Sequence, residues 1–127
     1  MSSPDARLIQ AAADARRNAV CDITGYAVGA AVQAQDGSIH QGCNIENIVL
    51  GATVCAEKVA LFKAISEGHH RFDTVAVFTR SSPPATPCGS CRQLLFHWGV
   101  QRVVSSNPEG EVAEWSMGHL LPDAFAI

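Results

Sequence analysis

The stretch CAEKVALFKAISE, residues 55–67, is predicted to form a helix that ends at Gly68. Its larger apolar residues recur near helical spacing and would form the buried face: Val59, Leu61, Phe62 and Ile65. A second stretch, PCGSC at residues 87–91, follows a stiff, proline-rich loop and also opens a helix. Two cysteine-bearing helix starts, each placed after a strand or loop, indicate an α/β protein.

Upstream of residue 55, the sequence predicts one helix and one hairpin. The first segment is expected to be a helix that is capped by Ser3 and has Pro4 in its first turn. Its buried face would consist of residues at helical spacing: Leu8, Ala12, Ala15 and Ala19, with Ile9 at the edge. Residues 26–35 predict a strand, Asp-Gly at 36–37 predicts a two-residue turn, and residues 38–44 return as the partner strand.

Downstream of residue 68, strands and helices alternate again. Strands are predicted at 74–79, 102–106 and 111–115, a helix at 92–98, and a last helical turn at 117–121. The order α-β-β-α-β-α-β-β-α predicts an α/β fold with a mixed five-stranded sheet and helices on its faces, a three-layer α/β/α sandwich. A chain of 127 residues fits a single domain over residues 1–127.

The composition limits the kinds of partner. The formal net charge is −3, and lysine and arginine do not gather into a stripe, so we expect no nucleic-acid polymer as partner. The first residues lack the order of a secretory signal, and no run reaches the ~18 apolar residues of a membrane span. We therefore expect a cytoplasmic, soluble protein that has no membrane partner and acts on a small molecule.

Three of the cysteines have the spacing of metal ligands. The total of five is odd, so they cannot all pair within the chain. Cys55, Cys88 and Cys91 would fill three corners of a zinc tetrahedron and leave the fourth for water. The positive ends of the two helices would lower the pKa of these thiols. We therefore predict Zn²⁺ as the cofactor.

Glu57, two residues after the first ligand, has the chemistry of a proton shuttle. It would take a proton from water, pass it to a ring nitrogen and then help to protonate departing ammonia, as in zinc deaminases with this pattern. Two alternatives for the cysteines remain open. Cys88 and Cys91 alone also have the spacing of a redox dithiol. Cys43 or a histidine as a fourth ligand would instead make a closed structural zinc site.

The chain resembles the cytidine deaminase family in its small, homotetrameric form, with blasticidin S deaminase as a more distant relative. Short motifs in order carry the resemblance: VGAA at 28–31, GCNIEN at 42–47, CAE at 55–57, AISEG at 64–68, PCGSCRQ at 87–93 and LLPDAF at 120–125. The resemblance implies zinc-dependent hydrolytic deamination of cytidine, deoxycytidine or a close analogue to the uridine-type product and ammonia. It also implies a homotetramer in which Phe125 reaches into a neighbouring subunit's site and stacks on the base.

The resemblance further implies which residues bind the nucleoside. Asn44 and Glu46 would hold the ribose hydroxyls, for which an amide and a carboxylate offer donors and acceptors. Tyr26 stands where the family usually has a phenylalanine beside the base. Backbone groups around Ala56 and Ser90 would meet the base edge.

The sequence departs from the family pattern at two places. After residue 47 the family commonly has alanine, a variable residue and then tyrosine or phenylalanine, whereas this chain has Ile48, Val49 and Leu50. Lys58 replaces an arginine, so the compact charge of an ammonium group stands where the family usually has a planar guanidinium group with several donors. The alternatives are therefore a deaminase of a different or modified aminopyrimidine nucleoside, blasticidin S-like or N4-substituted, and a zinc-binding module without catalysis.

Overall fold

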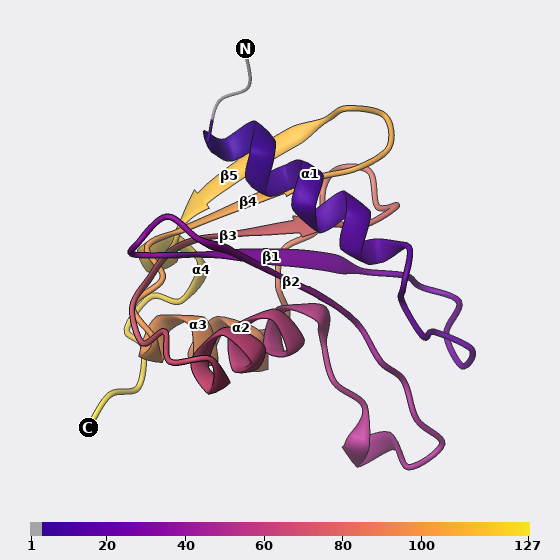
Figure 1. Cartoon of the computed structure of the whole chain (residues 1–127), viewed down its shortest axis with the longest axis horizontal. Helices are drawn as coiled ribbons and strands as arrows, with labels where there is room; N and C mark the ends of the chain where they lie inside the picture. Colours follow the sequence, from indigo (N-terminus) through magenta and orange to yellow (C-terminus); the bar gives the residue numbers. More distant parts are fainter. Residues whose placement is uncertain (1–3) are drawn as a thin grey trace.

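The computed structural model describes residues 4–127, so Ser3, the predicted cap of the first helix, lies outside the described residues. The elements follow the predicted order, with one short 3-10 helix added after the second strand (Figure 1). They are α1 (Pro4–Arg16), β1 (Gly29–Ala34), β2 (Ile39–Cys43), η1 (Leu50–Ala52), α2 (Ala56–Ser66), β3 (Phe72–Phe78), α3 (Gly89–His97), β4 (Arg102–Ser106), β5 (Val112–Ser116) and α4 (Met117–Leu120). Within the described residues, no helix is both long enough and apolar enough to cross a membrane.

The strands of the described chain form one mixed five-stranded sheet in the order β2-β1-β3-β4-β5. β3 and β4 run parallel, and the other neighbouring strands run antiparallel. α1 covers one face of the sheet, whereas α2 and α3 lie on the other (Figure 1). The predicted three-layer α/β/α sandwich is confirmed. Because α3 forms the crossover between the parallel strands, its start lies near the end of β3.

α2 approaches β2 so closely that only glycine fits between them. A Cβ atom on Gly42 would lie 2.4 Å from the amide nitrogen of Ala60 and 2.6 Å from the carbonyl oxygen of Ala56. The buried face of α2 therefore consists mainly of small residues: Ala56, Glu57, Ala60, Leu61 and Ala64. Of the residues predicted for this face, Leu61 is buried, and Ile65 is half-buried and packs against the core. The prediction is wrong at Phe62, which is exposed, because a helix this close to the sheet turns its alanines inward. Val59 is partly exposed.

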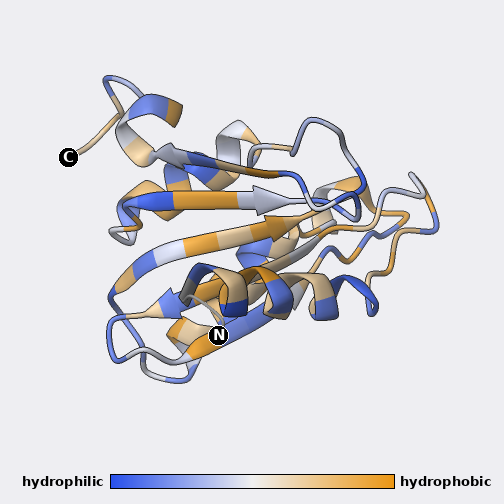
Figure 2. Cartoon of the chain, turned by 90° about the horizontal axis from the view of Figure 1, so that it is seen from above, coloured by the Kyte–Doolittle hydropathy of each residue, from blue (hydrophilic) through white to orange (hydrophobic). Residues whose placement is uncertain are grey.

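α1 packs on the opposite face in the same manner. A Cβ atom on Gly29 would lie 1.9 Å from the carbonyl oxygen of Ala12. Three of the predicted residues are buried as expected: Leu8, Ala12 and Ala15. The helix ends at Arg16, so Ala19 lies beyond it. Apolar residues of the strands fill the space between the layers (Figure 2).

Two predicted boundaries differ from the structure close to the cysteines. β1 begins at Gly29 and not at residue 26, and the preceding Tyr26 and Val28 line a cavity. α3 begins at Gly89, three residues before the predicted start, because the Sγ atom of Cys88 accepts a hydrogen bond from the Cys91 amide at 3.5 Å and caps the helix. The sequence pattern did not predict the short helix η1.

Candidate active site

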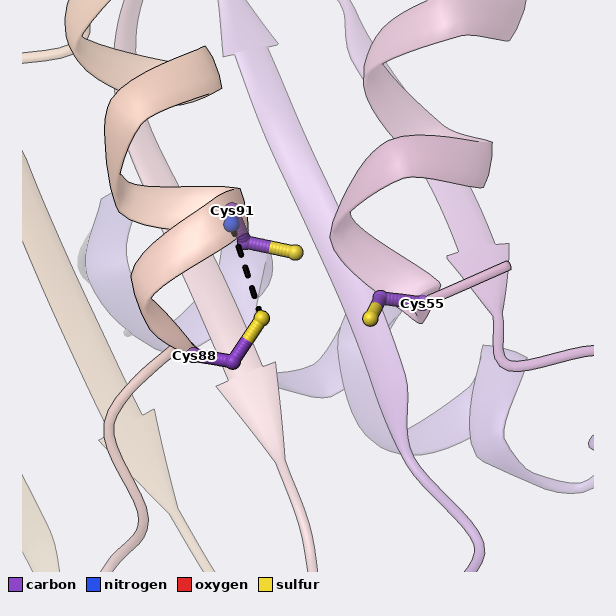
Figure 3. A group of neighbouring side chains, drawn as sticks. All are labelled: Cys55, Cys88 and Cys91. Carbon is purple, nitrogen blue, oxygen red and sulfur yellow. Dashed lines mark hydrogen bonds between the residues drawn. The ribbon is translucent and has the colours of Figure 1, made fainter. Parts of the chain in front are cut away.

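Three sulfur atoms meet where two helices begin. Cys55 directly precedes α2, Cys88 directly precedes α3, and Cys91 lies in the first turn of α3. The side chains come from two neighbouring helix starts and their sulfur atoms face a common space (Figure 3). All three Sγ atoms lie within 4.8 Å of one another. The structure thus brings together the cysteines that the sequence spacing singled out.

The sulfur triangle fits a zinc ion. Zn²⁺ binds thiolates at about 2.3 Å in a tetrahedron, which sets the sulfur atoms about 3.8 Å apart. All five cysteines are free thiols, so none of these ligands is taken up by a disulfide. Among residues 4–127 this group holds three ligands, and neither Cys43 nor a histidine belongs to it. The donor set therefore leaves one corner of the tetrahedron open, unlike a closed structural site.

The protein environment alone opposes ionisation of two of these thiols. Burial raises the pKa of Cys91, which is fully buried, and the pKa of Cys55. Burial has the same tendency at Cys88, but hydrogen bonds from the Cys91 amide and with both neighbouring thiols outweigh it and lower the pKa. Three thiolates therefore need positive charge at this point, which a divalent cation and two helix N-termini supply.

Glu57 is a buried carboxyl group in the first turn of α2. It is 5% exposed, and burial raises its pKa, with the nearby Lys58 ammonium group acting against the shift. Glu57 lines one cavity together with Cys55 and Cys88, and its charge, after burial, contributes to raising the pKa of Cys91. A raised pKa brings a carboxyl group closer to the pH at which enzymes work, and this favours acid–base catalysis.

A cavity of about 290 Å³ lies beside the cysteines. Its wall is formed by the segment before β1, the loop after β2, the start of α2 and the loop from β3 to α3. Apart from Phe125 and Ser90, it contains the residues predicted to bind or convert the substrate: Tyr26, Asn44, Glu46, Ala56 and Glu57. Cys55 and Cys88 line the same cavity. Residues distant in sequence thus form one pocket at the start of α2.

The Glu46 carboxylate is held by the segment before β1. Its Oε1 atom accepts hydrogen bonds from the amides of Ile23 and Thr24, both at 3.0 Å, and its Oε2 atom accepts one from the Thr24 hydroxyl at 2.5 Å. These bonds, led by that of the hydroxyl, lower the pKa of Glu46. An ionised carboxylate has about four acceptor sites, so one stays available to a hydroxyl group in the cavity.

The Asn44 side chain is also partly engaged within the chain. It is 8% exposed. Its Oδ1 atom accepts a hydrogen bond from the Val28 amide and its Nδ2 atom donates one to the Tyr26 carbonyl, both at 2.9 Å. The second N–H of the amide remains for a ligand. Asn44 therefore offers a donor and Glu46 an acceptor on the same cavity wall.

Phe125 and Leu50 are described by the structure but lie outside the cavity of their own chain. Phe125 is 73% exposed, and its carbonyl oxygen accepts a hydrogen bond from Nε2 of Gln93 at 2.9 Å. Leu50 is 72% exposed in the loop after β2. Ser90 lies in the first turn of α3, outside this cavity as well. Neither apolar side chain contributes to the wall of this cavity.

Sequence reasoning missed several residues of the cavity wall and one anchor. The missed wall residues include Thr53, Val54, Thr79, Ala85 and Thr86. Arg92 donates from Nε to the Pro87 carbonyl at 2.8 Å, from Nη2 to the Thr86 hydroxyl at 2.7 Å, and from Nη1 to the Leu120 carbonyl at 2.9 Å. Arg92 therefore fixes the end of the loop that carries Cys88. The position of Arg92 directly after Cys91 was the feature of the sequence that could have indicated this role.

Comparison with known proteins shows which proteins the chain is similar to. Residues 2–107 match the family model described as the cytidine and deoxycytidylate deaminase zinc-binding region. The cytidine deaminase of Sporosarcina psychrophila is 40% identical over 122 residues, which cover 94% of this chain and 90% of the relative. The blasticidin-S deaminase of Bacillus cereus is 28% identical over 130 residues, which cover 96% of this chain and 92% of that protein.

Solved structures show the same arrangement of the chain. The crystal structure of cytidine deaminase from Burkholderia pseudomallei superposes with a TM-score of 0.89 at 41% identity, over 94% of this chain and 97% of that one. The cytidine deaminase structure from Mycobacterium tuberculosis gives a TM-score of 0.84 at 32% identity, over 99% of this chain and 100% of that one. The similarity therefore extends over nearly the whole chain.

Proposed function

The chain belongs to the cytidine and deoxycytidylate deaminase family, and on this basis we propose that its substrate is a free cytosine nucleoside, cytidine or deoxycytidine. As a member of the family, it is a zinc-dependent hydrolase that acts on C–N bonds. One observation carries the proposal: the buried Glu57 carboxyl group and an open set of three cysteines adjoin one cavity with Asn44 and Glu46. The reaction replaces the amino group at C4 of the cytosine ring by the oxygen of water.

We assign the zinc ion to Cys55, Cys88 and Cys91. When bound, zinc supplies the Lewis acidity that makes a water molecule nucleophilic near neutral pH. The starts of α2 and α3 both lie at this point, and their positive ends offset part of the negative charge of three thiolates. The Thr86–Pro87 end of the loop is held by Arg92, which keeps Cys88 in position.

Glu57 moves the protons of the reaction. Its carboxylate takes a proton from the attacking water and gives it to N3 of the ring while the C4–O bond forms. It then carries the proton of the new hydroxyl group to the amino nitrogen. The C4–N bond breaks, ammonia leaves, and the C4 carbonyl remains on the uridine-type product. Glu57 ends as a carboxylate, ready for the next cycle. Its burial supports this role, because the raised pKa makes the carboxylate a stronger base toward the attacking water.

Other residues of the cavity wall recognise the sugar and the base. The remaining N–H of Asn44 and the remaining acceptor site of Glu46 suit the ribose hydroxyls. Tyr26 lines the wall with Ala56, and an aromatic ring at this position suits contact with a planar base. Recognition at both ends of the nucleoside fixes C4 next to Glu57.

We further propose a homotetramer in which Phe125 completes a neighbour's cavity. Phe125 is exposed outside its own cavity, and the loop after β2 exposes three consecutive aliphatic side chains: Ile48 by 90%, Val49 by 63% and Leu50 by 72%. A contiguous exposed apolar patch marks a contact surface. Phe125→Ala is expected to keep its zinc and raise KM for cytidine, because one face of the base loses its aromatic partner. Analytical ultracentrifugation of the wild type measures the assembly.

A second candidate is deamination of a modified aminopyrimidine nucleoside. Two observations favour it: the chain has Leu50 where the family commonly has an aromatic residue, and it is 28% identical to a blasticidin-S deaminase. The larger Ile48 occupies the place of the usual alanine, so this region is reshaped and not simply widened.

The decisive experiment is a substrate panel with the zinc-loaded protein. Ammonia release is measured for cytidine, deoxycytidine, 5- and N4-substituted analogues and blasticidin S. Highest kcat/KM on cytidine or deoxycytidine supports the first proposal, and a substituted compound ranked first supports the second. Full zinc occupancy with no turnover of any compound would leave a zinc-binding module without catalysis.

We also propose that residues 1–127 act as one domain in the cytoplasm without a nucleic-acid polymer as partner. A site of three thiol ligands needs reduced cysteines, which reducing compartments maintain. The net charge of −3 disfavours phosphate backbones.

A further inference from the structure

One wall of the cavity is the loop from β3 to α3, residues 79–88. Thr79, Ala85, Thr86 and Cys88 from this loop line the cavity. The loop has no regular secondary structure over residues 81–88, so its shape depends on bonds to other elements. Arg92 holds the end near Cys88. The other end has a separate anchor.

That second anchor is the turn between β4 and β5. Asn107 is 2% exposed, and its Nδ2 atom donates to the Ser81 carbonyl at 3.0 Å and to Oε1 of Glu111 at 2.8 Å. Its Oδ1 atom accepts from the Glu111 amide at 3.0 Å. The hydroxyl group of Ser82 donates to the same Oε1 atom of Glu111. One amide and one carboxylate thus hold two successive residues of the loop.

The bonds continue from Ser81 to the cavity itself. The Ser81 hydroxyl and the Tyr26 hydroxyl form a hydrogen bond at 2.5 Å. The guanidinium group of Arg80 lies 5.3 Å from the centroid of the Tyr26 ring. Tyr26 is therefore held from the loop at both its ring and its hydroxyl group, while its backbone carbonyl is bonded to Asn44. Asn107 and Glu111 do not line the cavity, yet they connect to a residue that does.

We propose that Asn107 and Glu111 are positioning residues that act through Ser81 to fix the Tyr26 ring against the bound nucleoside. This inference rests on the proposed function, because it concerns one wall of that same site. Arg92 holds the metal-ligand end of the loop independently. Loosening the Ser81 end therefore weakens nucleoside binding and leaves the zinc ligands in place.

The test starts from Glu111→Ala, which removes the acceptor shared by Ser82 and Asn107. KM for cytidine is expected to rise about fivefold, the effect of roughly one net hydrogen bond, with kcat and zinc content unchanged. Glu111→Gln keeps an acceptor oxygen and is expected to have a KM for cytidine close to that of the wild type. Glu109→Ala, in the same turn and also exposed, is the matched control and is expected to leave KM unchanged.

A second measurement does not depend on turnover. Tyr26 is the one tyrosine of the chain, so ring-13C tyrosine gives a single set of ring signals by NMR. Glu111→Ala is expected to shift and broaden these signals, and Glu109→Ala is not. The double variant Glu111→Ala/Tyr26→Phe is expected to have a kcat/KM only slightly below that of Tyr26→Phe alone. The effects of two substitutions on one chain of contacts are not additive.

Unchanged KM and unchanged Tyr26 signals in Glu111→Ala would overturn the inference, as would fully additive effects of the two substitutions. A parallel loss of zinc and kcat would also overturn it, because that pattern reports general weakening of the fold. Lack of turnover in the wild type refutes the proposed function. In that case the Tyr26 signals still decide whether Glu111 positions this ring.

Discussion

Two loops line the same cavity and are held in opposite ways. The anchored loop, residues 79–88, is bonded at one end to Asn107 and Glu111 and at the other to Arg92. The apolar loop, residues 45–54, is paired at its base, where Ile45 and Val54 form an isolated bridge, but it extends from the body of the molecule and exposes its aliphatic residues (Figure 1). The first wall is thus fixed by bonds within the chain, whereas the second exposes the apolar side chains that the proposed homotetramer would cover.

The largest expected effect concerns Glu57, which lines the cavity from the first turn of α2. Glu57→Gln keeps the size of the side chain and one hydrogen bond but cannot carry a proton. We expect kcat to fall by at least about 100-fold, the usual lower limit for acid–base catalysis, with zinc content and thermal stability retained. If the variant kept more than about a tenth of wild-type turnover, Glu57 would not be the proton shuttle.

The next prediction separates the ligands from the other cysteines. Serine in place of Cys55, Cys88 or Cys91 is expected to lower zinc content and the unfolding temperature together, because metal binding also stabilises the fold. Cys21→Ser and Cys43→Ser are the matched controls and should retain zinc. Zinc titration of each metal-stripped variant provides the measurement. Zinc loss in Cys43→Ser would instead point to a closed site.

A smaller effect is expected in the apolar loop. Leu50→Tyr combined with Ile48→Ala restores the family's usual pattern. The kcat/KM for cytidine should therefore rise relative to the kcat/KM for bulkier analogues. A change of this size in a pocket shifts discrimination by about 1–3 kcal/mol, so the ranking by kcat/KM should move gradually. Val112→Tyr adds the same group at another exposed site and serves as control. An unchanged ranking would show that the apolar loop does not set specificity.

The smallest effect is expected at the base of the apolar loop, where Thr24 bonds Glu46. The folded-state pKa of Glu46 is lowered, so the stabilisation from its bonds is present above the ordinary carboxyl pKa and is lost as the pH falls through the lowered value. Thr24→Val removes the hydroxyl bond and raises this pKa toward its ordinary value. The acid limb of the kcat/KM profile should then move to higher pH, while Thr24→Ser retains the wild-type profile. Identical profiles for Thr24→Val and wild type would show that the ionisation of Glu46 does not set the acid limb.

The sequence predicted the order of the layers and the grouping of the cysteines because both have local signals, namely periodicity and short spacing. It failed at the inner face of α2. Helical period assigns the large Phe62 to the core, whereas the contact with Gly42 turns the small Ala60 inward. It also missed the bond between Asn107 and Ser81, since polar pairs 26 residues apart have no periodic pattern.

The contact at Gly42 has a consequence for how the enzyme responds to heat. Side chains between two layers can change rotamer as the temperature rises, whereas two backbones in direct contact have no such freedom. The first turns of α2 rest on β2 in this way and carry Glu57 with them. An error of about 1 Å in such a group can cost about 100-fold in rate. Warming should therefore disturb the loops around the cavity well before it displaces Glu57, the proposed proton shuttle.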